Sequence, residues 1–183
     1  LRANINDMLD RAEDPEKMIK QVLQDMENQL IQVKTQVAAS IADEQRLKQR
    51  VSLRPEYRLL RTVPGIGEVL ATTIMLEAGP VSRFGAVGNF ASYCRCVDTL
   101  RESNGRKKGE GTGKNGNKYL AWAFVEAANF ALRYCPQAKS FYERKKRKTN
   151  VVVAIKALAH KLARACFHIL REQKPFDVNR CFA

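Results

Sequence analysis

A serine at the edge of a basic, glycine-rich loop is the residue best placed to do chemistry in this sequence. Ser103 lies near the start of the stretch 102–120, ESNGRKKGEGTGKNGNKYL, which holds five glycines and five basic residues. A serine hydroxyl is a poor nucleophile unless a base takes its proton, and attack on an anionic group also requires cations that neutralise its charge. Four basic residues could supply those cations: Arg101, Arg106, Lys107 and Lys108. These four and Lys114 are also predicted DNA contacts. The alternative is that Ser103 only caps a turn with Asn104 and Gly105.

A second candidate contact to a phosphate backbone is the turn Pro64, Gly65, Ile66 and Gly67. It stands between two apolar segments in LLRTVPGIGEVLATTIMLEAG, residues 59–79, the pattern of a helix-hairpin-helix. Glycines let the backbone approach a ligand, and the unpaired amides at the start of the second helix favour an anion. The alternative is an ordinary helix turn, because such turns occur in many proteins. A backbone contact of this kind fixes register on DNA and reads no bases.

Two further helices are predicted to present cations. One begins near Asn117 and directs Leu120, Phe124, Ala127, Ala131 and Tyr134 to the core, which leaves Lys118 on another face. The other follows the basic run 143–150 and carries a ridge of Lys156, His160, Arg164, His168 and Arg171. Lys118, Lys156 and Arg164 are predicted DNA contacts. The alternative for the ridge is an ordinary amphipathic surface, and the two histidines have no matching acid or cysteine to form a catalytic triad or a metal site.

The charge distribution supports a polyanionic partner for the second part of the chain only. The 183 residues carry a net charge of +13, divided as −1 over residues 1–53 and +14 over residues 54–183. Nucleic acid is therefore expected ahead of membrane. Five cysteines without a CxxC pair predict neither a disulfide framework nor a zinc site, and they fit a reducing cytoplasm. No apolar run approaches the roughly 20 residues of a membrane span, and no secretory leader is recognised.

The amino-terminal part predicts one long helix. Asp14, Pro15 and Glu16 form a typical helix start, and the predicted helix runs to about Arg50. Its apolar residues follow one stripe, which consists of Ile19, Val22, Met26, Leu30, Val33, Val37 and Ile41. A long helix with one narrow stripe cannot bury itself, so a second helix is required. We expect the chain to form a homo-oligomer through this helix.

The first 48 residues resemble the amino-terminal helices of the phage shock protein A family, membrane-associated stress proteins that assemble from long helical hairpins. The stretch that carries the resemblance is NINDMLDRAEDPEKMIKQVLQDMENQLIQVKTQVAASIADEQRL, and EDPEKMI is its most specific part. The remaining helices of that family have no counterpart in this chain. The alternative is a generic coiled-coil arm, which explains the same spacing.

Residues 58–177 resemble the carboxy-terminal domain of insertion-sequence transposases that pair a RuvC-like acidic domain with a catalytic serine, the group that includes bridge-RNA-guided recombinases. Four blocks carry the resemblance in order: RTVPGIGEVLATT, RFGAVGNFASYCR, SNGRKKGEGTGKNGNKYLAWAFVEAANFA and AKSFYERKKRKTNVVVAIKALAHKLARACFHILREQKPFD. The resemblance implies that Ser103 attacks DNA, and it adds a guide RNA as a candidate partner. The chain departs from the family at Cys96-Val97-Asp98-Thr99 and in having no RuvC-like acidic domain upstream.

These observations predict an all-α protein in two parts: a coiled-coil-like helical arm over residues 1–50 and a compact helical domain over residues 51–183. The function predicted first is a DNA-binding transposase domain with Ser103 as nucleophile, incomplete without a separate acidic domain. The ten acids of residues 54–183 form no close aspartate pair. No metal site or cofactor is therefore expected in this chain, and Mg²⁺ is expected only with that separate domain. The alternatives are a non-catalytic nucleic-acid-binding module and a phage-shock-like membrane-stress protein.

Overall fold

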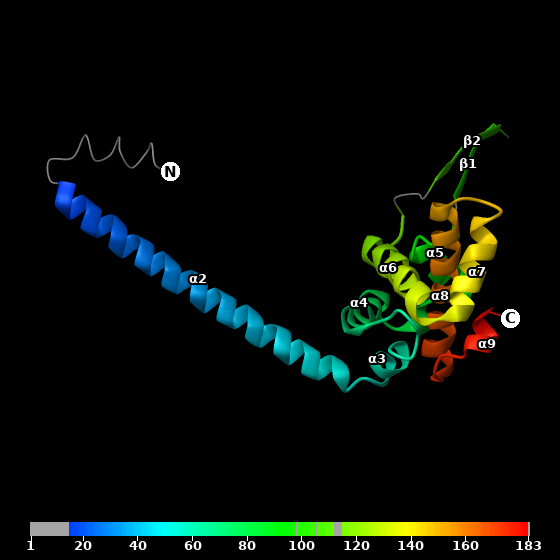
Figure 1. The fold of residues 1–183 in the computed structure, drawn as a ribbon, viewed down its shortest axis with the longest axis horizontal. Helices are drawn as coiled ribbons and strands as arrows, with labels where there is room; N and C mark the ends of the chain where they lie inside the picture. The colour runs from blue at the N-terminus through cyan, green and yellow to red at the C-terminus, as the bar shows by residue number, and fades with distance from the viewer. Residues whose placement is uncertain (1–14, 98, 105, 112–114, 183) are drawn as a thin grey trace. The chain divides into compact units, whose positions relative to one another are not determined.

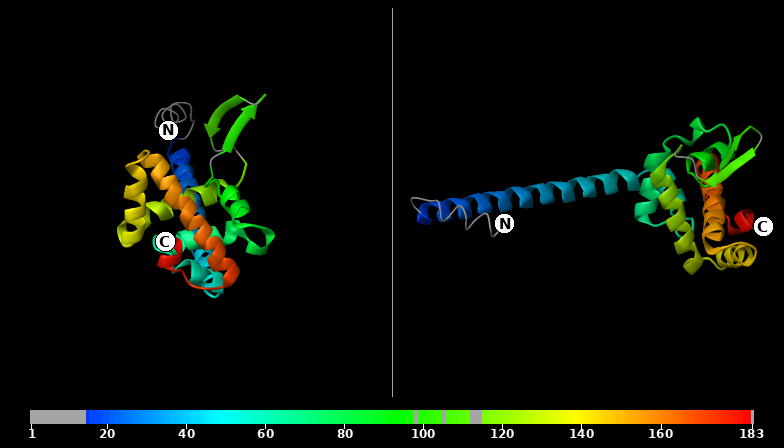
Figure 2. Two further views of the ribbon diagram at one scale, coloured as in Figure 1. Left: turned by 90° about the vertical axis from the view of Figure 1, so that its right-hand side faces the viewer. Right: turned by 90° about the horizontal axis from the view of Figure 1, so that it is seen from above.

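The computed structural model describes residues 15–97, 99–104, 106–111 and 115–182; for Pro15 and the strand residues 99–103 and 107–111 it describes the backbone. The chain divides into two compact units, Leu1–Arg50 and Val51–Ala183. Figures 1 and 2 show the elements of both units. The predicted long helix and compact helical region are confirmed.

The first unit consists of helix α2, Pro15–Ser52, whose last two residues belong to the second unit. The helix starts at the predicted proline and carries Glu16 in its first turn, where a carboxylate is favoured by the helix dipole. Its stripe is exposed to solvent, because Met26, Leu30 and Val33 each keep more than half of their surface accessible. This apolar stripe has no partner among the described residues of the chain.

The second unit is built around helix α8, Val151–Glu172. The side chain of Asn150 begins this helix by accepting a hydrogen bond from the amide of Val153 at 2.8 Å. The other helices are α3 (Pro55–Leu60), α4 (Glu68–Ala78), the 3-10 helix η1 (Val81–Arg83), α5 (Val87–Tyr93), α6 (Lys118–Tyr134), α7 (Pro136–Lys146) and α9 (Val178–Phe182). Of these, α3, η1, α5, α6, α7 and α9 all contact α8 (Figure 1).

Three phenylalanines lie at the centre of the core. Phe90 from α5 lies 6.2 Å from Phe124 of α6 and 5.9 Å from Phe167 of α8, measured between ring centroids. All three side chains are fully buried, and small residues of α6 and α8 let the helix backbones approach one another. Tyr134 is 71% exposed, so its predicted place in the core is wrong. It stands at the last turn of α6.

The basic glycine-rich segment forms a β-hairpin. Strand β1, Thr99–Ser103, pairs antiparallel with strand β2, Arg106–Gly111, and the hairpin projects away from the helices (Figures 1 and 2). The sequence predicted a flexible loop here, because strand-forming apolar residues are nearly absent. Asn104 occupies the left-handed region at φ 54° and reverses the chain between the strands. The hairpin is the only sheet in the described part of an otherwise helical protein.

Candidate nucleic-acid interface

The turn between α3 and α4 is fixed by a glycine that touches another helix. Gly65 has φ +91°, and a Cβ at this position would lie 2.3 Å from the carbonyl oxygen of Ala127 and 2.6 Å from the amide nitrogen of Ala131. The absence of a side chain therefore lets the turn pack directly on the backbone of α6. Sequence patterns alone could not show this contact, because α6 begins more than fifty residues later.

The four residues predicted to contact DNA in this turn take different positions. The side chain of Ile66 belongs to the core, and Pro64 is half-buried. Gly67 is exposed and precedes α4 as its N-cap, with open space around it. The first turn of α4 also carries Glu68, whose carboxylate accepts a hydrogen bond from Arg61 at 3.2 Å. The predicted phosphate contact of this turn thus depends on backbone amides beside a paired carboxylate.

A clamp holds together the two ends of the segment that contains the hairpin. The Arg95 Nη2 atom donates to the carbonyl oxygen of Gly116 at 2.9 Å, and the amide of Asn117 donates to the carbonyl oxygen of Tyr93 at 2.7 Å. Gly116 has φ +99°, and a Cβ there would meet the Tyr93 carbonyl oxygen at 2.6 Å. The hairpin therefore leaves the helical body and returns to it at one narrow base.

Asn117 also fixes the start of α6, as the sequence predicted. Its Oδ1 atom accepts hydrogen bonds from the amides of Tyr119 at 2.8 Å and Leu120 at 3.1 Å. Its Nδ2 atom donates to Glu77 of α4 at 2.6 Å. A hydrogen bond with Arg83 lowers the pKa of the Tyr93 hydroxyl, and a hydrogen bond with Asn117 adds a smaller effect in the same direction. One asparagine thus joins α4, α6 and the base of the hairpin.

A cationic pocket of about 230 Å³ opens at this base. Arg95 from the hairpin base, Lys118 from the start of α6 and Lys156 from α8 bring three positive charges to it. The other lining residues are Cys96, Ala121, Val125 and Ala159, so no carboxylate lines the pocket. Burial raises the pKa of the Cys96 thiol to about 12, against a smaller lowering by Lys156. The thiol is therefore neutral near pH 7 and leaves the positive charge of the pocket intact.

The structure thus unites two predicted DNA contacts, Lys118 and Lys156, and adds Arg95, which sequence analysis did not propose. Arg95 follows α5 in the left-handed region at φ 54°. Its type and its place before a basic segment were visible in the sequence. Its direction was not, because the backbone reversal that turns it toward Gly116 depends on tertiary contacts.

The predicted nucleophile, Ser103, ends strand β1, and the register places Arg106 opposite it across the turn. Residues opposite one another in an antiparallel pair are close neighbours. The pairing shifts between Arg101 and Glu102, which leaves Lys108 as the extra residue of the second strand. The side chains of Ser103, Arg101, Lys107 and Lys108 lie outside the described part of the structure, as does all of Lys114.

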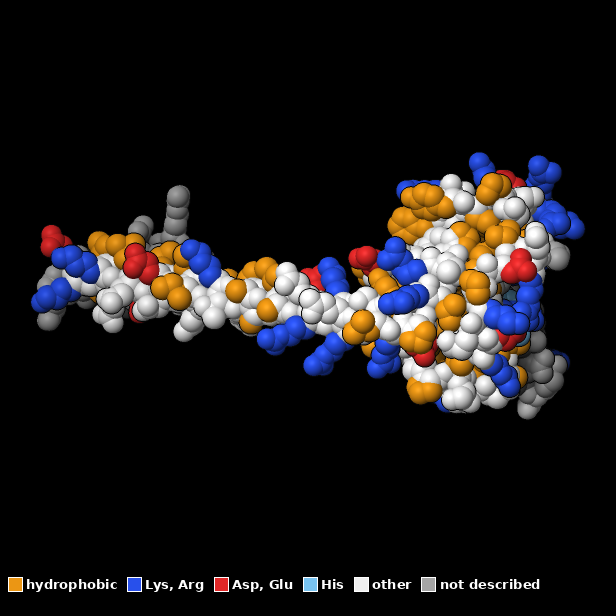
Figure 3. All heavy atoms as spheres, turned by 90° about the horizontal axis from the view of Figure 1, so that it is seen from below, with side chains coloured by type: hydrophobic (Ala, Val, Ile, Leu, Met, Phe, Trp, Pro, Cys, Tyr) orange, Lys and Arg blue, Asp and Glu red, His pale blue; other side chains and the backbone are white. Residues whose placement is uncertain are grey.

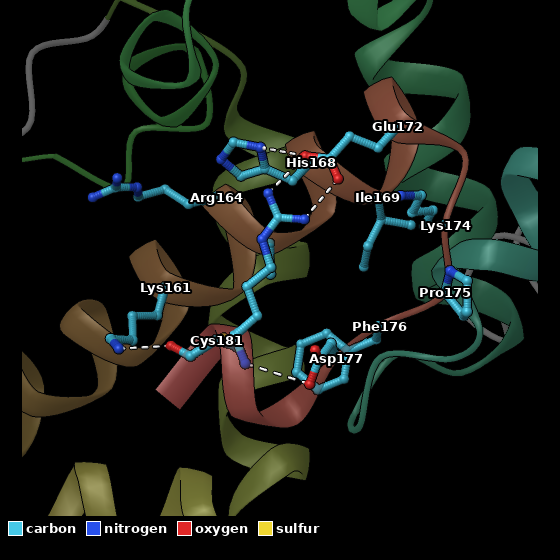
Figure 4. A pocket seen from close by; sticks show the side chains of 12 residues that line it. Lys161, Arg164, His168, Ile169, Glu172, Lys174, Pro175, Phe176, Asp177 and Cys181 are labelled. Atoms are coloured by element: carbon cyan, nitrogen blue, oxygen red, sulfur yellow. Dashed lines mark hydrogen bonds and ion pairs between the residues drawn. The ribbon is translucent and has the colours of Figure 1, made fainter. Parts of the chain in front are cut away.

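Arg164 lies apart from the cationic pocket, two turns farther along α8 than Lys156. It lines a second cavity of about 290 Å³ between α8 and the carboxy-terminal segment (Figure 4). Arg180 of α9 forms a bidentate pair with Glu172 across this cavity, at 2.6 and 2.7 Å. His168 Nδ1 lies 3.3 Å from the same carboxylate. The two groups meet because they are one helical turn apart.

The described part of the chain contains no group of three or more histidine, cysteine, aspartate or glutamate side chains that could hold a metal ion. None of its helices combines the length and the apolar character that crossing a bilayer requires. The five cysteines are free thiols.

Comparison with known proteins confirms both resemblances. Residues 57–143 match the family model described as Transposase IS116/IS110/IS902 family, and residues 1–56 match that of the PspA/IM30 family. Val51–Ala183 therefore contains a domain similar to a transposase domain, and the first unit is similar to the start of a PspA/IM30 protein.

Individual relatives divide in the same way. A probable family 20 transposase of Pseudomonas aeruginosa is 26% identical over 161 residues, covering 85% of this chain and 44% of the relative. An insertion element IS110 protein of Streptomyces coelicolor is 24% identical over 119 residues, covering 64% of this chain and 29% of the relative. The membrane-associated protein Vipp1 of Synechocystis is 46% identical over 52 residues, covering 28% and 20%. The chain spans less than half the length of each of these relatives.

Proposed function

We propose that Val51–Ala183 is a DNA-binding transposase domain that acts in insertion-sequence transposition. The observation that carries the proposal is the cationic pocket at the base of the Ser103 hairpin, where Arg95, Lys118 and Lys156 gather without a carboxylate. Nucleic-acid phosphates are the polyanions that such a cluster binds most readily. The similarity of residues 57–143 to a transposase family supports DNA over other polyanions.

The reaction we propose for Ser103 is attack on a DNA phosphodiester. The hydroxyl oxygen forms a new ester bond to phosphorus, and the bond from phosphorus to one deoxyribose oxygen breaks. A base receives the serine proton, and the departing deoxyribose oxygen gains one. The phosphoserine would retain the ester bond, so a second strand could be joined by the reverse attack. Arg106, opposite Ser103 in the hairpin register, would help to neutralise the phosphate, and the pocket cations at the base of the hairpin would bind other phosphates of the same DNA.

The proposed activity also requires an acidic domain. A separate acidic domain would supply the carboxylates and any Mg²⁺ that strand transfer requires. The experiment is therefore run with the chain alone and with an acidic domain supplied in trans. DNA carrying a nick near the cleavage site releases the leaving strand and traps a covalent adduct, which denaturing electrophoresis detects.

The expected result is an adduct with the wild-type chain plus the acidic domain, and its loss in Ser103→Ala. The matched control is Ser82→Ala, an exposed serine on η1. If the adduct persists in Ser103→Ala, another residue is the nucleophile. If no adduct forms under either condition while DNA still binds, the alternative function, a non-catalytic nucleic-acid-binding module, is correct.

The DNA-binding part of the proposal is tested by the dependence of duplex affinity on salt. Several phosphate contacts make affinity fall steeply as the salt concentration rises. Arg95→Ala, Lys118→Ala and Lys156→Ala should each reduce that slope by about one. A slope near zero would contradict binding to nucleic acid and would favour the membrane-stress alternative. That alternative predicts binding of residues 1–50 to anionic vesicles.

We also propose that α2 is an oligomerisation arm. Its exposed apolar stripe requires a partner helix, and a second copy supplies an identical stripe. The similarity to PspA/IM30 proteins and the long helix support self-association. Val33→Asp should shift the sedimentation of the full chain toward the monomer, whereas Lys34→Asp, one position off the stripe, should not. The free thiols fit the reducing cytoplasm, where we place the protein.

A further inference from the structure

Helix α6 exposes a row of aromatic side chains. Tyr119, Trp122, Phe130 and Tyr134 have exposed fractions of 52, 48, 40 and 71%. With half-buried Glu126 between them, their spacing of three, four, four and four residues follows one face of the helix. From Tyr119 to Tyr134 the row extends about 22 Å, at 1.5 Å per residue. Four rings left in solvent along one helix form an apolar patch that is unusual for surface not used in binding.

The fold does not need these rings. The adjoining face of α6 supplies the core, with Leu120, Ala123, Phe124, Ala127, Ala128 and Ala131 all fully buried. Figure 3 shows apolar and basic side chains intermixed on the face of the second unit that it presents. The aromatic row therefore does not contribute to the core, and its exposed rings are available to bind a ligand.

Cations accompany the rings. Lys118 Nζ lies 5.0 Å from the centroid of the Tyr119 ring, and the Arg133 guanidinium lies 5.7 Å from that of Phe130. Glu126 is the one carboxylate on this helix, so Lys118 and Arg133 outweigh it. Rings with a positive charge near each end of the row match a strand of unpaired nucleotides, in which bases stack on aromatic faces and phosphates lie beside cations.

The row is also continuous with the cationic pocket. Lys118 both contacts the Tyr119 ring and lines the pocket with Arg95 and Lys156. A strand whose phosphate occupies the pocket can therefore continue along α6 with its bases toward the rings. A purely protein partner would not require the rings to be joined to a pocket that lacks carboxylates.

We infer that the exposed face of α6 binds unpaired nucleobases of a nucleic-acid strand that enters through the Arg95, Lys118 and Lys156 pocket. This inference rests on the proposed nucleic-acid role and deepens it. The shared chemistry is the unpaired base, which could belong to a DNA strand opened for transfer or to an RNA. Sequence preference is not expected, because every base offers a flat face for stacking.

Trp122 makes the inference directly measurable, because it is the only tryptophan in the chain. Excitation at 295 nm selects its emission in the full-length protein. Titration with oligo(dT) and with oligo(rU) should quench that emission, because a base stacked in this row contacts or shields the indole. A duplex of the same length should bind with little quenching. Tighter binding of one oligomer identifies DNA or RNA as the source of the bases.

The variants are Phe130→Ala and Tyr134→Ala, both at exposed positions. Each variant should weaken binding of the single-stranded oligonucleotides by roughly fivefold to a hundredfold, because stacking is worth about 1–3 kcal/mol per base. Duplex affinity should stay unchanged. The matched controls are Leu76→Ala on α4 and Val152→Ala on α8, exposed apolar residues outside the row. Circular dichroism melting checks that every variant remains folded.

Three outcomes would overturn the inference. The first is unchanged Trp122 emission at oligonucleotide concentrations that saturate binding, and the second is a loss of oligonucleotide affinity in the row variants no larger than that in the controls. The third is that the row variants alter the sedimentation of the protein and leave its oligonucleotide affinity intact. The last would show that the row contacts a second copy of the chain. These failures are distinct from failure of the proposed function. Loss of the Ser103 adduct and of duplex binding, with quenching retained, would reject the transposase role alone.

Discussion

The guanidinium of Arg95 donates a hydrogen bond to the carbonyl oxygen of Gly116 at 2.9 Å, across a segment of twenty residues that contains the hairpin. The same side chain lines the cationic pocket. One arginine therefore both closes the base of the hairpin and contributes charge to the proposed phosphate site. Its two roles can be separated because lysine preserves the charge and lacks the guanidinium geometry.

Arg95→Ala should weaken duplex DNA binding and speed amide exchange in the hairpin. Arg95→Lys should keep most of the salt dependence and still speed the exchange, because lysine cannot reproduce the Nη2 contact to Gly116. Salt-titrated binding and hydrogen exchange measure the two effects. Lys139→Ala, an exposed cation on α7 outside the pocket, is the control. Unchanged exchange in Arg95→Ala would contradict the clamp.

Gly65→Ala should destabilise the second unit by about 3 kcal/mol or more, because strain at positive φ adds to the cost of overpacking. The collision is with the backbone of α6 at Ala127 and Ala131, which cannot rotate away. Gly67→Ala, two residues later, has open space around its Cβ and should cost about 1 kcal/mol at most through the weaker N-cap. Urea unfolding of both variants measures the difference. Equal losses would show that the contact with α6 is not the cause.

Glu172 should contribute to stability in a defined acidic range. The hydrogen bonds from Arg180 lower the pKa of its carboxyl from 4.5 to about 2. A pKa lowered in the folded state stabilises the fold above the unfolded value, and this contribution is lost as pH falls from about 4.5 through about 2. In Glu172→Gln the corresponding loss between these pH values should be absent.

The measurement is the free energy of unfolding against pH, with Glu56→Gln on α3 as the control carboxyl. A carboxyl carbon NMR titration gives the Glu172 pKa itself, and Arg180→Ala should raise it toward 4.5. A pKa that stays near 2 in Arg180→Ala would show that His168, rather than Arg180, sets the shift.

Four of the five cysteines, Cys94, Cys96, Cys166 and Cys181, should react slowly with thiol reagents in the folded protein. Burial raises the pKa values of the Cys94 and Cys166 thiols strongly, that of Cys96 to about 12 and that of Cys181 to about 11. The thiolate is the reactive form, so little of it exists at pH 7.5. Titration with a chromogenic disulfide should count five fast thiols in denaturant. Two or more fast thiols in the native protein would contradict this prediction.

Some features of the protein could be predicted from sequence because their causes are local. The long helix over Pro15–Ser52 follows from its start residues and its uninterrupted periodicity. Asn117 is the cap of α6, where a side-chain oxygen reaches amides two and three residues away. The net positive charge of residues 54–183 follows directly from their numbers of basic and acidic residues.

The hairpin was missed for a physical reason. Residues 99–111 contain few β-branched or aromatic residues, so their composition predicts a loop. The clamp from Tyr93 to Asn117 and from Arg95 to Gly116 brings the two ends together, after which antiparallel pairing satisfies the backbone. That clamp joins positions more than twenty residues apart, which no local pattern records.

By itself, the sequence determined the helical class, the two-part organisation of charge and the candidate serine, because composition, periodicity and motifs are properties of neighbouring residues. Only the tertiary structure decided that Lys118 and Lys156 share a pocket with Arg95, that Arg164 lies at another cavity beside Glu172, and that Gly65 touches α6. These relationships arise when helices cross in a packed core. The position of a crossing depends on the shapes of all the surfaces that meet there.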